Sequence, residues 1–283
     1  MDNLVALVTG ASSGMGRETA LSLDAKGVTV YAAARHPMPE LEDRGIHTLH
    51  MDVTDEDSAQ AGVAAIMDSE GYIDILVNNA GYGSYGTIEE VPLSEARHQF
   101  DVNVFGAMRL TQLVLPQMID RGRGRIVNIS SMGGKFAMAL GGWYHATKYA
   151  LEALSDALRQ EVRPLGVDVV LIEPGLIHTN WPVIAAQNLR ATSGLGKYAV
   201  IAQNFAAALD FAGQGLATDP AVLGRLIARA ATTKRPRTRY RKGMGALTMT
   251  TLLPLIPDRV FDLGVRLFLT HLDTLLGLVE KKH

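Results

Sequence analysis

Residues 4–16 carry the sequence LVALVTGASSGMG, and this stretch decides the fold. An apolar run that predicts a buried strand leads directly into a glycine-rich turn, and a helical pattern follows over residues 15–26. Glycines allow a tight turn and let backbone N–H groups approach a pyrophosphate, whose charge the helix N-terminus stabilises. A glycine motif alone is weak evidence, since it can merely form a turn. Its position between a first strand and a first helix, however, is the one that a dinucleotide site requires.

Short apolar runs and longer helical patterns alternate along the chain as far as Pro174. The apolar runs are nearly continuous, which indicates a parallel sheet that helices cover on both faces. We therefore expect an α/β fold: a doubly wound Rossmann parallel sheet in three α/β/α layers, with a helical C-terminal extension. The further strands are expected at residues 28–33, 46–51, 73–77, 125–129 and 167–172, and the further helices at residues 55–69, 94–121 and 143–163.

Composition excludes several classes of function. The formal net charge of -2 gives no field for capturing nucleic acid, so we expect no nucleic-acid partner. The absence of cysteine excludes disulfides, thiolate chemistry and cysteine-based zinc sites, and it suits a reducing cytoplasm. The N-terminal residues lack the pattern of a signal peptide, because the first strand already begins near residue 3. The predicted location is cytoplasmic.

The end of the second strand indicates which dinucleotide binds. NAD-binding enzymes place an acid about 20 residues after the glycines, where it accepts a hydrogen bond from the ribose 2′-hydroxyl. In this chain Ala34 takes that place and Arg35 comes next. A guanidinium can bind a 2′-phosphate through two hydrogen bonds, which predicts NADP(H) in preference to NAD(H). The alternative is that Arg35 is a solvated residue at the strand end.

A tyrosine, a lysine and a serine predict the chemistry. Tyr144 and Lys148 are four residues apart in a helical pattern and therefore share a face, one turn apart. A nearby ammonium lowers the pKa of a phenol and makes proton exchange with an alcohol or carbonyl oxygen feasible. Ser131, just after the fifth predicted strand, can hold the substrate oxygen beside Tyr144. In isolation, such a tyrosine–lysine pair would more often be a helix-surface pair.

Taken together, these motifs resemble those of the short-chain dehydrogenase/reductase family. They follow the family order from residue 4 to about residue 180, and Met15 is a small departure because a branched aliphatic residue is usual there. The C-terminal part of the chain also resembles extensions in bacterial family members close to the hydroxysteroid and retinol dehydrogenases, which is a weaker match than the core motifs. The matching segments are Thr9 to Gly16, Asn78-Asn79-Ala80-Gly81, Asn103, Ser131, Tyr144, Lys148, and Pro174-Gly175 through Thr179.

The resemblance implies roles for individual residues. Asn103 would hold a water that connects Lys148 to solvent, although from its apolar surroundings alone it is a core amide. Lys148 would also contact the nicotinamide ribose, and Ile177 and Thr179 would hold the carboxamide. The catalytic residues are thus Asn103, Ser131, Tyr144 and Lys148. The predicted cofactor-binding residues are Gly10, Ser12, Ser13, Gly14, Met15, Gly16, Arg35, Asp52, Val53, Asn79, Ala80, Gly81, Ile129, Tyr144, Lys148, Pro174, Gly175, Ile177 and Thr179.

The implied activity is hydride transfer between NADP(H) and an alcohol or ketone carbon. The predicted substrate-binding residues are Ser131, Phe136, Tyr144 and Trp181, and the neighbouring apolar residues favour a steroid-, retinoid- or lipid-like molecule. Two alternatives remain: a non-catalytic NADP(H)-sensing protein, which would not need the four catalytic residues, and an epimerase or dehydratase, which the short chain disfavours. The family often forms dimers or tetramers through the helices at 94–121 and 143–163, so a homodimer or homotetramer is expected.

The pattern changes after Pro174. Residues 175–200 predict a mobile loop and short helices, and helical patterns resume at residues 198–213 and 219–232 before a possible strand at 238–241. We expect residues 1–242 to form one Rossmann-type catalytic domain, in which residues 175–213 bind the substrate. Residues 243–283 would be an apolar helical extension packed on it. No charge-free run in the extension reaches the roughly 18–20 residues that span a bilayer.

Other prominent residues have ordinary interpretations. His145 is expected to pack and His178 has no partner at ligand spacing, so no metal site is predicted. The basic run at residues 234–242 is expected to be a strand whose arginines face solvent. The alternative is that residues 234–283 contact anionic lipid headgroups at a membrane surface.

Overall fold

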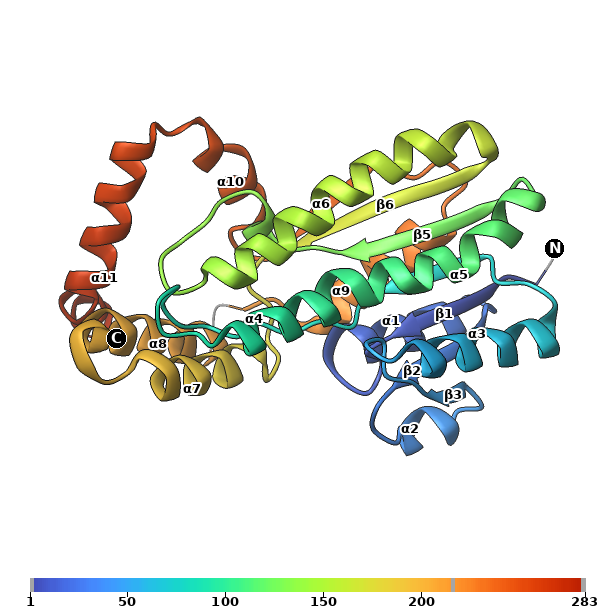
Figure 1. Ribbon diagram of the computed structural model, residues 1–283, viewed down its shortest axis with the longest axis horizontal. Coiled ribbons are helices and arrows are strands. Elements are labelled where there is room, and N and C mark those ends of the chain that lie inside the picture. Colours follow the sequence, from blue (N-terminus) through green and yellow to red (C-terminus); the bar gives the residue numbers. More distant parts are fainter. Residues whose placement is uncertain (1–2, 215–216, 281–283) are drawn as a thin grey trace.

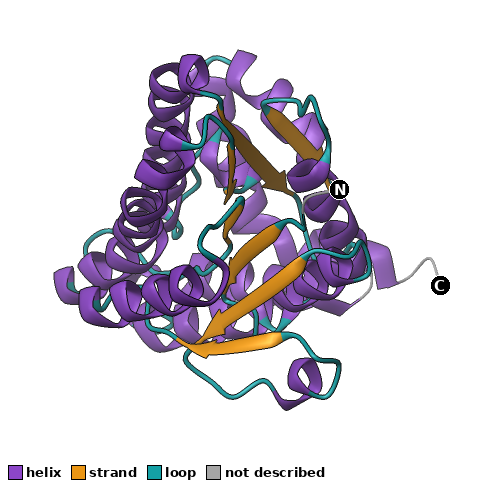
Figure 2. Ribbon diagram, turned by 90° about the vertical axis from the view of Figure 1, so that its right-hand side faces the viewer, coloured by secondary structure: helices purple, strands orange, loops and turns teal. Residues whose placement is uncertain are grey.

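The computed structural model describes residues 3–214 and 217–280, which form a seven-stranded sheet with helices on both faces (Figures 1 and 2). Every strand pair is parallel, and the strand order is β3-β2-β1-β4-β5-β6-β7. The order reverses between β1 and β4, and open sheets of this kind bind ligands at the carboxyl ends of such strands. The strands are β1 (Val5–Thr9), β2 (Thr29–Ala34), β3 (His47–His50), β4 (Ile75–Asn78), β5 (Gly124–Ile129), β6 (Val167–Pro174) and β7 (Arg239–Lys242).

Alternate residues of each strand enter two separate cores. Ala6 and Val8 of β1 face the core shared with α1 (Gly14–Asp24) and α9 (Pro220–Thr232). Val5 and Leu7 face the opposite core, which α3 (Glu56–Glu70), α5 (Ala107–Asp120) and α6 (Gly142–Val162) cover. The expected three-layer α/β/α Rossmann architecture is therefore confirmed. The apolar runs in the sequence are nearly continuous because both faces of these strands are buried, as all five residues of β1 show.

The single helix predicted for residues 94–121 is interrupted. α4 (Leu93–Phe100) passes into a π-helical turn at Asp101–Gly106 before α5 begins. A Cβ atom at Gly106 would lie 2.8 Å from Val53 Cγ2, so only glycine allows this turn to pack so closely against the segment after β3. π-turns inside α-helices are frequent at functional sites. Here the turn carries Asn103, whose side chain is buried.

Four helices lie beyond the carboxyl ends of the strands (Figure 1). They are α7 (Trp181–Ser193), α8 (Ala199–Gln214), α10 (Ala246–Thr251) and α11 (Asp258–Glu280). Residues 175–200, where a mobile loop and short helices were expected, contain α7, a regular helix of 13 residues, and the 3₁₀ turn at Gly196–Tyr198. Ala185, Ala186 and Leu189 are fully buried and pack α7 into the apolar cluster that it shares with α8, which explains its stability.

The helical C-terminal part is confirmed, and α11 packs on α8 through the buried side chain of Leu269. None of the helices within the described ranges has the length and apolar character of a bilayer-spanning segment. The remaining short elements are α2 (Pro39–Glu42) and the 3₁₀ turns at Met132–Gly134, Arg163–Leu165, Gly196–Tyr198 and Leu253–Leu255.

The arginines of β7 do not face solvent, so that expectation is wrong. The guanidinium of Arg239 lies 3.0 Å from a carboxylate oxygen of Glu173 and 3.1 Å from one of Glu152. The guanidinium of Arg241 lies 2.6 Å from Glu173. Glu173 and Glu152 are 0% and 4% exposed, and buried carboxylates require countercharges. Part of the basic run therefore neutralises acids on the neighbouring strand and on α6.

Candidate active site

The glycine loop after β1 crosses the chain segment after β4 at very short distance. Gly10 and Gly14 have positive φ values of 63° and 52°, which other residues rarely adopt. A Cβ atom at Gly10 would lie 2.9 Å from Ala80 Cα, and one at Gly16 would lie 2.2 Å from the Gly10 carbonyl oxygen. Any side chain at these positions would therefore displace backbone, which explains the glycine spacing.

The asparagine after β4 fixes this loop. The side-chain amide of Asn79 donates to the carbonyl oxygens of Thr9, at 2.9 Å, and Gly10, at 3.2 Å. In return, the Thr9 hydroxyl accepts from the backbone N–H groups of Asn79 and Ala80, at 3.1 and 3.0 Å. These four hydrogen bonds tie the glycine loop to the segment after β4, so the loop has a defined shape before a ligand binds.

The first turn of α1 suits an anionic ligand. Ser13 stands at the N-cap without a side-chain cap hydrogen bond, and the first turn has no acidic residue. The backbone N–H groups of that turn have no partner within the helix and carry its positive end. A Cβ atom at Gly14 would lie 3.2 Å from Thr179 Cγ2, so the segment after β6 lies directly over the loop. The residues present therefore fit a dinucleotide.

Arg35 lies at the carboxyl end of β2, where its side chain is 59% exposed. Its contact with Asp52 is long, at 3.9 Å, while Asp52 itself accepts hydrogen bonds from the backbone N–H and hydroxyl of Thr54. The guanidinium therefore keeps donors that a phosphate could use.

Tyr144 is buried in an aromatic cluster. Its side chain is 8% exposed, with ring centroids 5.4 Å from Trp181 and 5.7 Å from Tyr85. Burial raises the pKa of Tyr144 to about 12, and a hydrogen bond with the Ser131 side chain acts in the opposite direction. The phenol is therefore protonated at neutral pH in the protein alone.

Lys148 lies one turn along α6 with its ammonium buried. It donates a 3.0 Å hydrogen bond to the carbonyl oxygen of Ile129, at the end of β5, and lies 5.9 Å from the Tyr144 ring centroid. Burial lowers the pKa of Lys148 to about 8, against the opposing effect of the Glu152 carboxylate. The expected lowering of the Tyr144 pKa by this ammonium is thus absent, because burial dominates for the phenol.

The Ser131 hydroxyl lies at the turn between β5 and α6. It accepts a 3.0 Å hydrogen bond from the backbone N–H of Gly133, which fixes its oxygen beside Tyr144. The structure thus brings Ser131, Tyr144 and Lys148 together at the carboxyl edge of the sheet, near the glycine loop. Ser131 and Lys148 are 17 residues apart in sequence, and the Lys148 ammonium reaches from α6 to the last carbonyl of β5, just before Ser131.

Asn103 has the contacts of a satisfied core amide. Its Nδ2 donates to the Tyr82 carbonyl oxygen at 2.8 Å and to the Thr147 hydroxyl at 3.0 Å, and its Oδ1 accepts from the Tyr82 N–H at 3.0 Å. A Cβ atom at Gly81 would lie 3.0 Å from Asn103 Oδ1 and 3.7 Å from Lys148 Nζ. The asparagine and the lysine therefore both lie next to Gly81, although the asparagine side chain is bonded to the Tyr82 backbone and to Thr147.

The residues expected near the substrate differ in how exposed their side chains are. Phe136 is buried against His145, at 5.5 Å between ring centroids, and Trp181 covers Tyr144. Val183 and Ile184, in contrast, are 43% and 51% exposed. His145 packs as expected, with its Nδ1 2.8 Å from the Gly133 carbonyl oxygen.

Sequence reasoning missed Tyr85 and Glu152. A Cβ atom at Gly83 would lie 2.6 Å from Trp181 Cζ2, so this glycine permits the stack in which Tyr85 and Trp181 enclose Tyr144. Glu152 lies 2.8 Å from Lys135 and acts on Lys148, one turn away. An acid four residues after the lysine on a helix was the available signal for Glu152. Tyr85 had no such signal.

The chain matches known proteins along most of its length. A family model described as short chain dehydrogenase matches residues 4–188. The 3-ketodihydrosphingosine reductase of Bacteroides thetaiotaomicron is 32% identical over 95% of this chain and 98% of its own length. The NADPH-dependent 3-dehydrocapnine reductase of Ornithobacterium rhinotracheale is 35% identical over 91% of this chain and 94% of its own length.

The fold is similar to that of a solved structure over nearly the whole chain. The crystal structure of a short-chain dehydrogenase from Streptomyces avermitilis superimposes with a TM-score of 0.77 at 33% identity, covering 99% of both chains. The fold thus agrees with the matches along the sequence. The chain belongs to the short-chain dehydrogenase family and is an oxidoreductase with a Rossmann fold.

Proposed function

We propose that the protein transfers a hydride between NADP(H) and the alcohol or ketone carbon of an apolar substrate, with Tyr144 as general acid and base. The observation that carries this proposal is the convergence of Ser131, Tyr144 and Lys148 beside the glycine loop. Lys148 and Tyr144 are both buried one turn apart, and buried titratable groups of this kind are more typical of a functional site than of ordinary packing.

In the reductive direction, a dinucleotide bound at the glycine loop would supply the hydride. As the carbon–oxygen π electrons move to oxygen, that oxygen takes the proton of the Tyr144 hydroxyl, which is available because its pKa is about 12. The Ser131 hydroxyl donates a hydrogen bond to the same oxygen while negative charge develops there. Oxidation of an alcohol reverses these transfers.

Lys148 stabilises the phenolate that proton donation leaves on Tyr144. Its ammonium is buried, so its attraction for the new negative charge is less screened than in water. A pKa of about 8 keeps most of it protonated at neutral pH. Asn103, which like the lysine lies next to Gly81, holds the backbone of Tyr82 so that the site keeps its shape. Its role toward a relay water stays a prediction.

The cofactor would be held by the glycine loop, the segment after β4 and the segment after β6. Arg35 would bind the 2′-phosphate, because its exposed guanidinium has one long ionic contact. The name of the Ornithobacterium relative, an NADPH-dependent reductase, supports the same preference. The remaining predicted cofactor residues belong to the same proposed domain of residues 1–242. Asp52 and Val53 follow β3, and Ile129 ends β5.

The substrate is proposed to be a lipid-like ketone or alcohol. The aromatic and aliphatic side chains around Tyr144 favour an apolar molecule, and Trp181 and Phe136 would contact it. The two full-length relatives are named as reductases of 3-ketodihydrosphingosine and 3-dehydrocapnine, and both names describe reduction at a carbonyl.

The proposed homodimer would form through α4, the π-turn and α6. Leu93 and Phe105 expose 60% and 55% of their surface on this side, around a cavity of about 380 Å³. Phe105→Asp should reduce the sedimentation coefficient to that of a monomer. If the wild type already sediments as a monomer, the dimer proposal is wrong.

Peripheral membrane contact is proposed for the exposed apolar side chains of the C-terminal part. Leu247, Leu252 and Leu255 are 64%, 57% and 77% exposed. Flotation with vesicles that contain anionic lipid should recover the wild type, and Leu255→Glu should recover less. Equal recovery of both, or recovery of neither, contradicts this contact.

The activity itself is tested by NADPH oxidation with a panel of ketones, from small charged sugars to 2-decalone and long-chain ketones. We expect turnover of the apolar ketones and a lower KM for NADPH than for NADH. If no carbonyl is reduced and no alcohol is oxidised while NADPH binds tightly, the protein is a cofactor-sensing binding protein and the proposal is wrong.

A further inference from the structure

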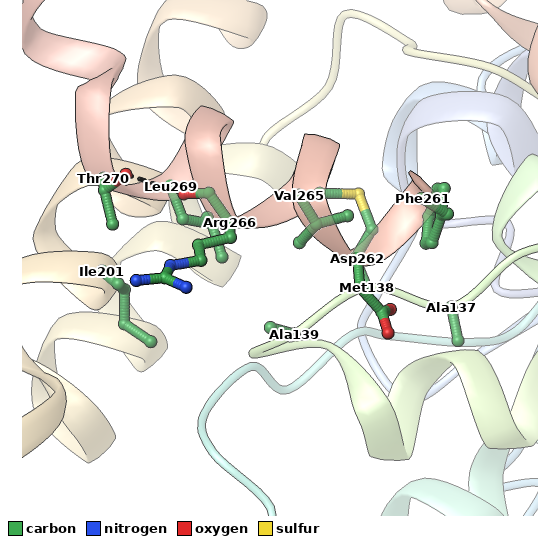
Figure 3. Close-up of a pocket in the computed structure, with 10 residues that line it drawn as sticks. All are labelled: Ala137, Met138, Ala139, Ile201, Phe261, Asp262, Val265, Arg266, Leu269 and Thr270. Carbon is green, nitrogen blue, oxygen red and sulfur yellow. Dashed lines mark hydrogen bonds between the residues drawn. The ribbon is translucent and has the colours of Figure 1, made fainter. Parts of the chain in front are cut away.

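A cavity lies between the C-terminal helix and the loop that follows Ser131 (Figure 3). Its volume is about 340 Å³, within the roughly 300–1,000 Å³ of small-molecule sites. One wall is the loop at residues 137–139, and the others are α8 and α11. Both helices lie outside residues 4–188, the segment matched by the family model, whereas the loop at residues 137–139 lies inside it.

The walls of the cavity are largely apolar and adjoin the aromatic cluster around Tyr144. Leu269 belongs to the same buried cluster as Tyr144, and Val265 and Ile201 pack against that cluster. On the loop side, Phe136 immediately precedes the cavity residues and packs on His145. A molecule in this cavity would therefore lie on the outer side of the proposed reaction centre.

Two opposite charges enter the otherwise apolar cavity from one helix. Asp262 and Arg266 are four residues apart on α11, and Figure 3 shows both side chains projecting into the space between α11, α8 and the loop. Neither side chain has a hydrogen bond or ion pair with any described residue, and they do not pair with each other. As far as the described residues go, the carboxylate and the guanidinium thus have hydrogen-bonding groups left to bind an ammonium and an anionic oxygen.

We propose that this cavity binds an amphiphile with a hydrocarbon chain and a zwitterionic head. The chain lies along Ile201, Val265 and Leu269, Arg266 binds the anionic group of the head, and Asp262 binds its cationic group. Resting on the proposed function, we assign the cavity to the part of the substrate that is remote from the carbonyl.

The zwitterionic head follows from the arrangement of the charges. A purely anionic head would bind Arg266 but meet repulsion from Asp262 one turn away, and a purely cationic head would meet the converse. A neutral head would pair with neither charge. Only a head with both signs pairs with both side chains.

Calorimetric titration of the full chain tests the binding site without any turnover. The probes are n-dodecylphosphocholine and, as a neutral control of equal chain length, n-dodecyl maltoside, each below its micellar concentration. We expect one dodecylphosphocholine per chain and weaker binding of the maltoside. Arg266→Gln should raise the Kd for dodecylphosphocholine about tenfold, the loss of one charge-assisted contact. Asp262→Asn should raise it less, and neither should change the Kd for the maltoside.

Matched controls exist on the same helix. Arg259→Gln and Asp258→Asn make the same charge changes on exposed residues of α11 that do not line the cavity, and they should leave both Kd values within about twofold. Equal weakening by Arg259→Gln and Arg266→Gln would mean non-specific attraction. Many equivalents per chain that no variant changes would mean adsorption to the exposed apolar side chains. Either result overturns the site.

Competition separates this inference from the proposed function. Dodecylphosphocholine should inhibit the reduction of 2-decalone competitively, with an inhibition constant close to its calorimetric Kd and raised by Arg266→Gln. If 2-decalone is reduced but the bound amphiphile does not compete, the assignment to the substrate is wrong. If no ketone is reduced, the proposed function fails, while the calorimetric result still decides whether the cavity binds a zwitterionic amphiphile.

Discussion

The two walls around Tyr144 are held by different forces. The inner wall, comprising the ends of β4 and β5, the π-turn and the start of α6, is fixed by buried polar contacts such as those of Lys148 with Ile129 and of Asn103 with Tyr82. The outer wall, comprising α7, α8 and α11, is held by apolar packing. One of its buried polar contacts is the 2.8 Å hydrogen bond from Asn204 to the carbonyl oxygen of Leu269.

This difference teaches which part of the site specifies the reaction. Hydrogen bonds and ion pairs have defined directions, so the inner wall places reacting groups at defined positions. Apolar contacts depend mainly on buried area and shape, so the outer wall can change its lining while it keeps its fold. Variants of the inner wall should therefore affect chemistry, and variants of the outer wall should affect stability and substrate affinity.

The largest effect is expected for Tyr144→Phe on the inner wall. Loss of the phenolic proton should reduce kcat for 2-decalone about 10³-fold, within the range of general acid catalysis. The Kd for NADPH, measured by fluorescence titration, should change less than about twofold, since the ring that packs on Trp181 remains. Loss of both turnover and cofactor binding, or of neither, would assign the tyrosine a different role.

Arg35→Ala, at the carboxyl end of β2, should have the next largest effect. Removing charge-assisted hydrogen bonds to a 2′-phosphate costs about 1.5–3 kcal/mol, so the KM for NADPH should rise roughly 10- to 100-fold. The KM for NADH, which lacks that phosphate, should stay nearly constant. Arg259→Gln on α11 is the control for a simple change in net charge. A parallel rise in both KM values would contradict the predicted preference.

Glu152→Gln should change the pH dependence of the reaction. The pKa of Lys148 is lowered to about 8 by burial, and the Glu152 carboxylate acts to raise it. Without that carboxylate the pKa falls further, so the ammonium is lost at a lower pH and the alkaline limb of kcat moves to lower pH.

Glu161→Gln is the matched control for this pH profile, because Glu161 is an exposed acid on the same helix. It should leave the alkaline limb unchanged. A uniform loss of kcat in Glu152→Gln with an unshifted profile would mean that Glu152 only supports Lys135 and Arg239, its two ion-pair partners.

The sequence was most informative about the inner wall. The six main strands were predicted to within about two residues, because continuous apolar runs are typical of strands buried on both faces. The π-turn was not predicted, because residues 101–106 have an ordinary helical pattern. The turn depends on the close approach of Gly106 to Val53, which is a tertiary contact. The ion pairs of Arg239 with Glu152 and Glu173 depend on tertiary structure, because partners 87 and 66 positions away in sequence leave no local signal.

The outer wall was harder to predict because small residues stabilise helices only through their packing. The start of α7 at Trp181-Pro182 resembles a loop, yet proline in the first turn is typical of a helix start. Its stability depends on burial of Ala185 and Ala186 against α8, which no local pattern reveals. The charges of Asp262 and Arg266 likewise resemble an ordinary solvated helix face until the cavity beside them is known.

Asn204→Leu on the outer wall should have the smallest effect on turnover and tests the comparison most sharply. The variant leaves the buried carbonyl of Leu269 without its donor, at a cost of about 1–3 kcal/mol, so thermal or urea unfolding should show lower stability. Because no reacting group is bonded to this side chain, kcat for 2-decalone should stay within about twofold of the wild type. A fall in kcat as large as that of an inner-wall variant would mean that apolar packing transmits strain from α11 to Tyr144, through Phe268, Phe205 and Tyr85. The two walls would then act as one unit.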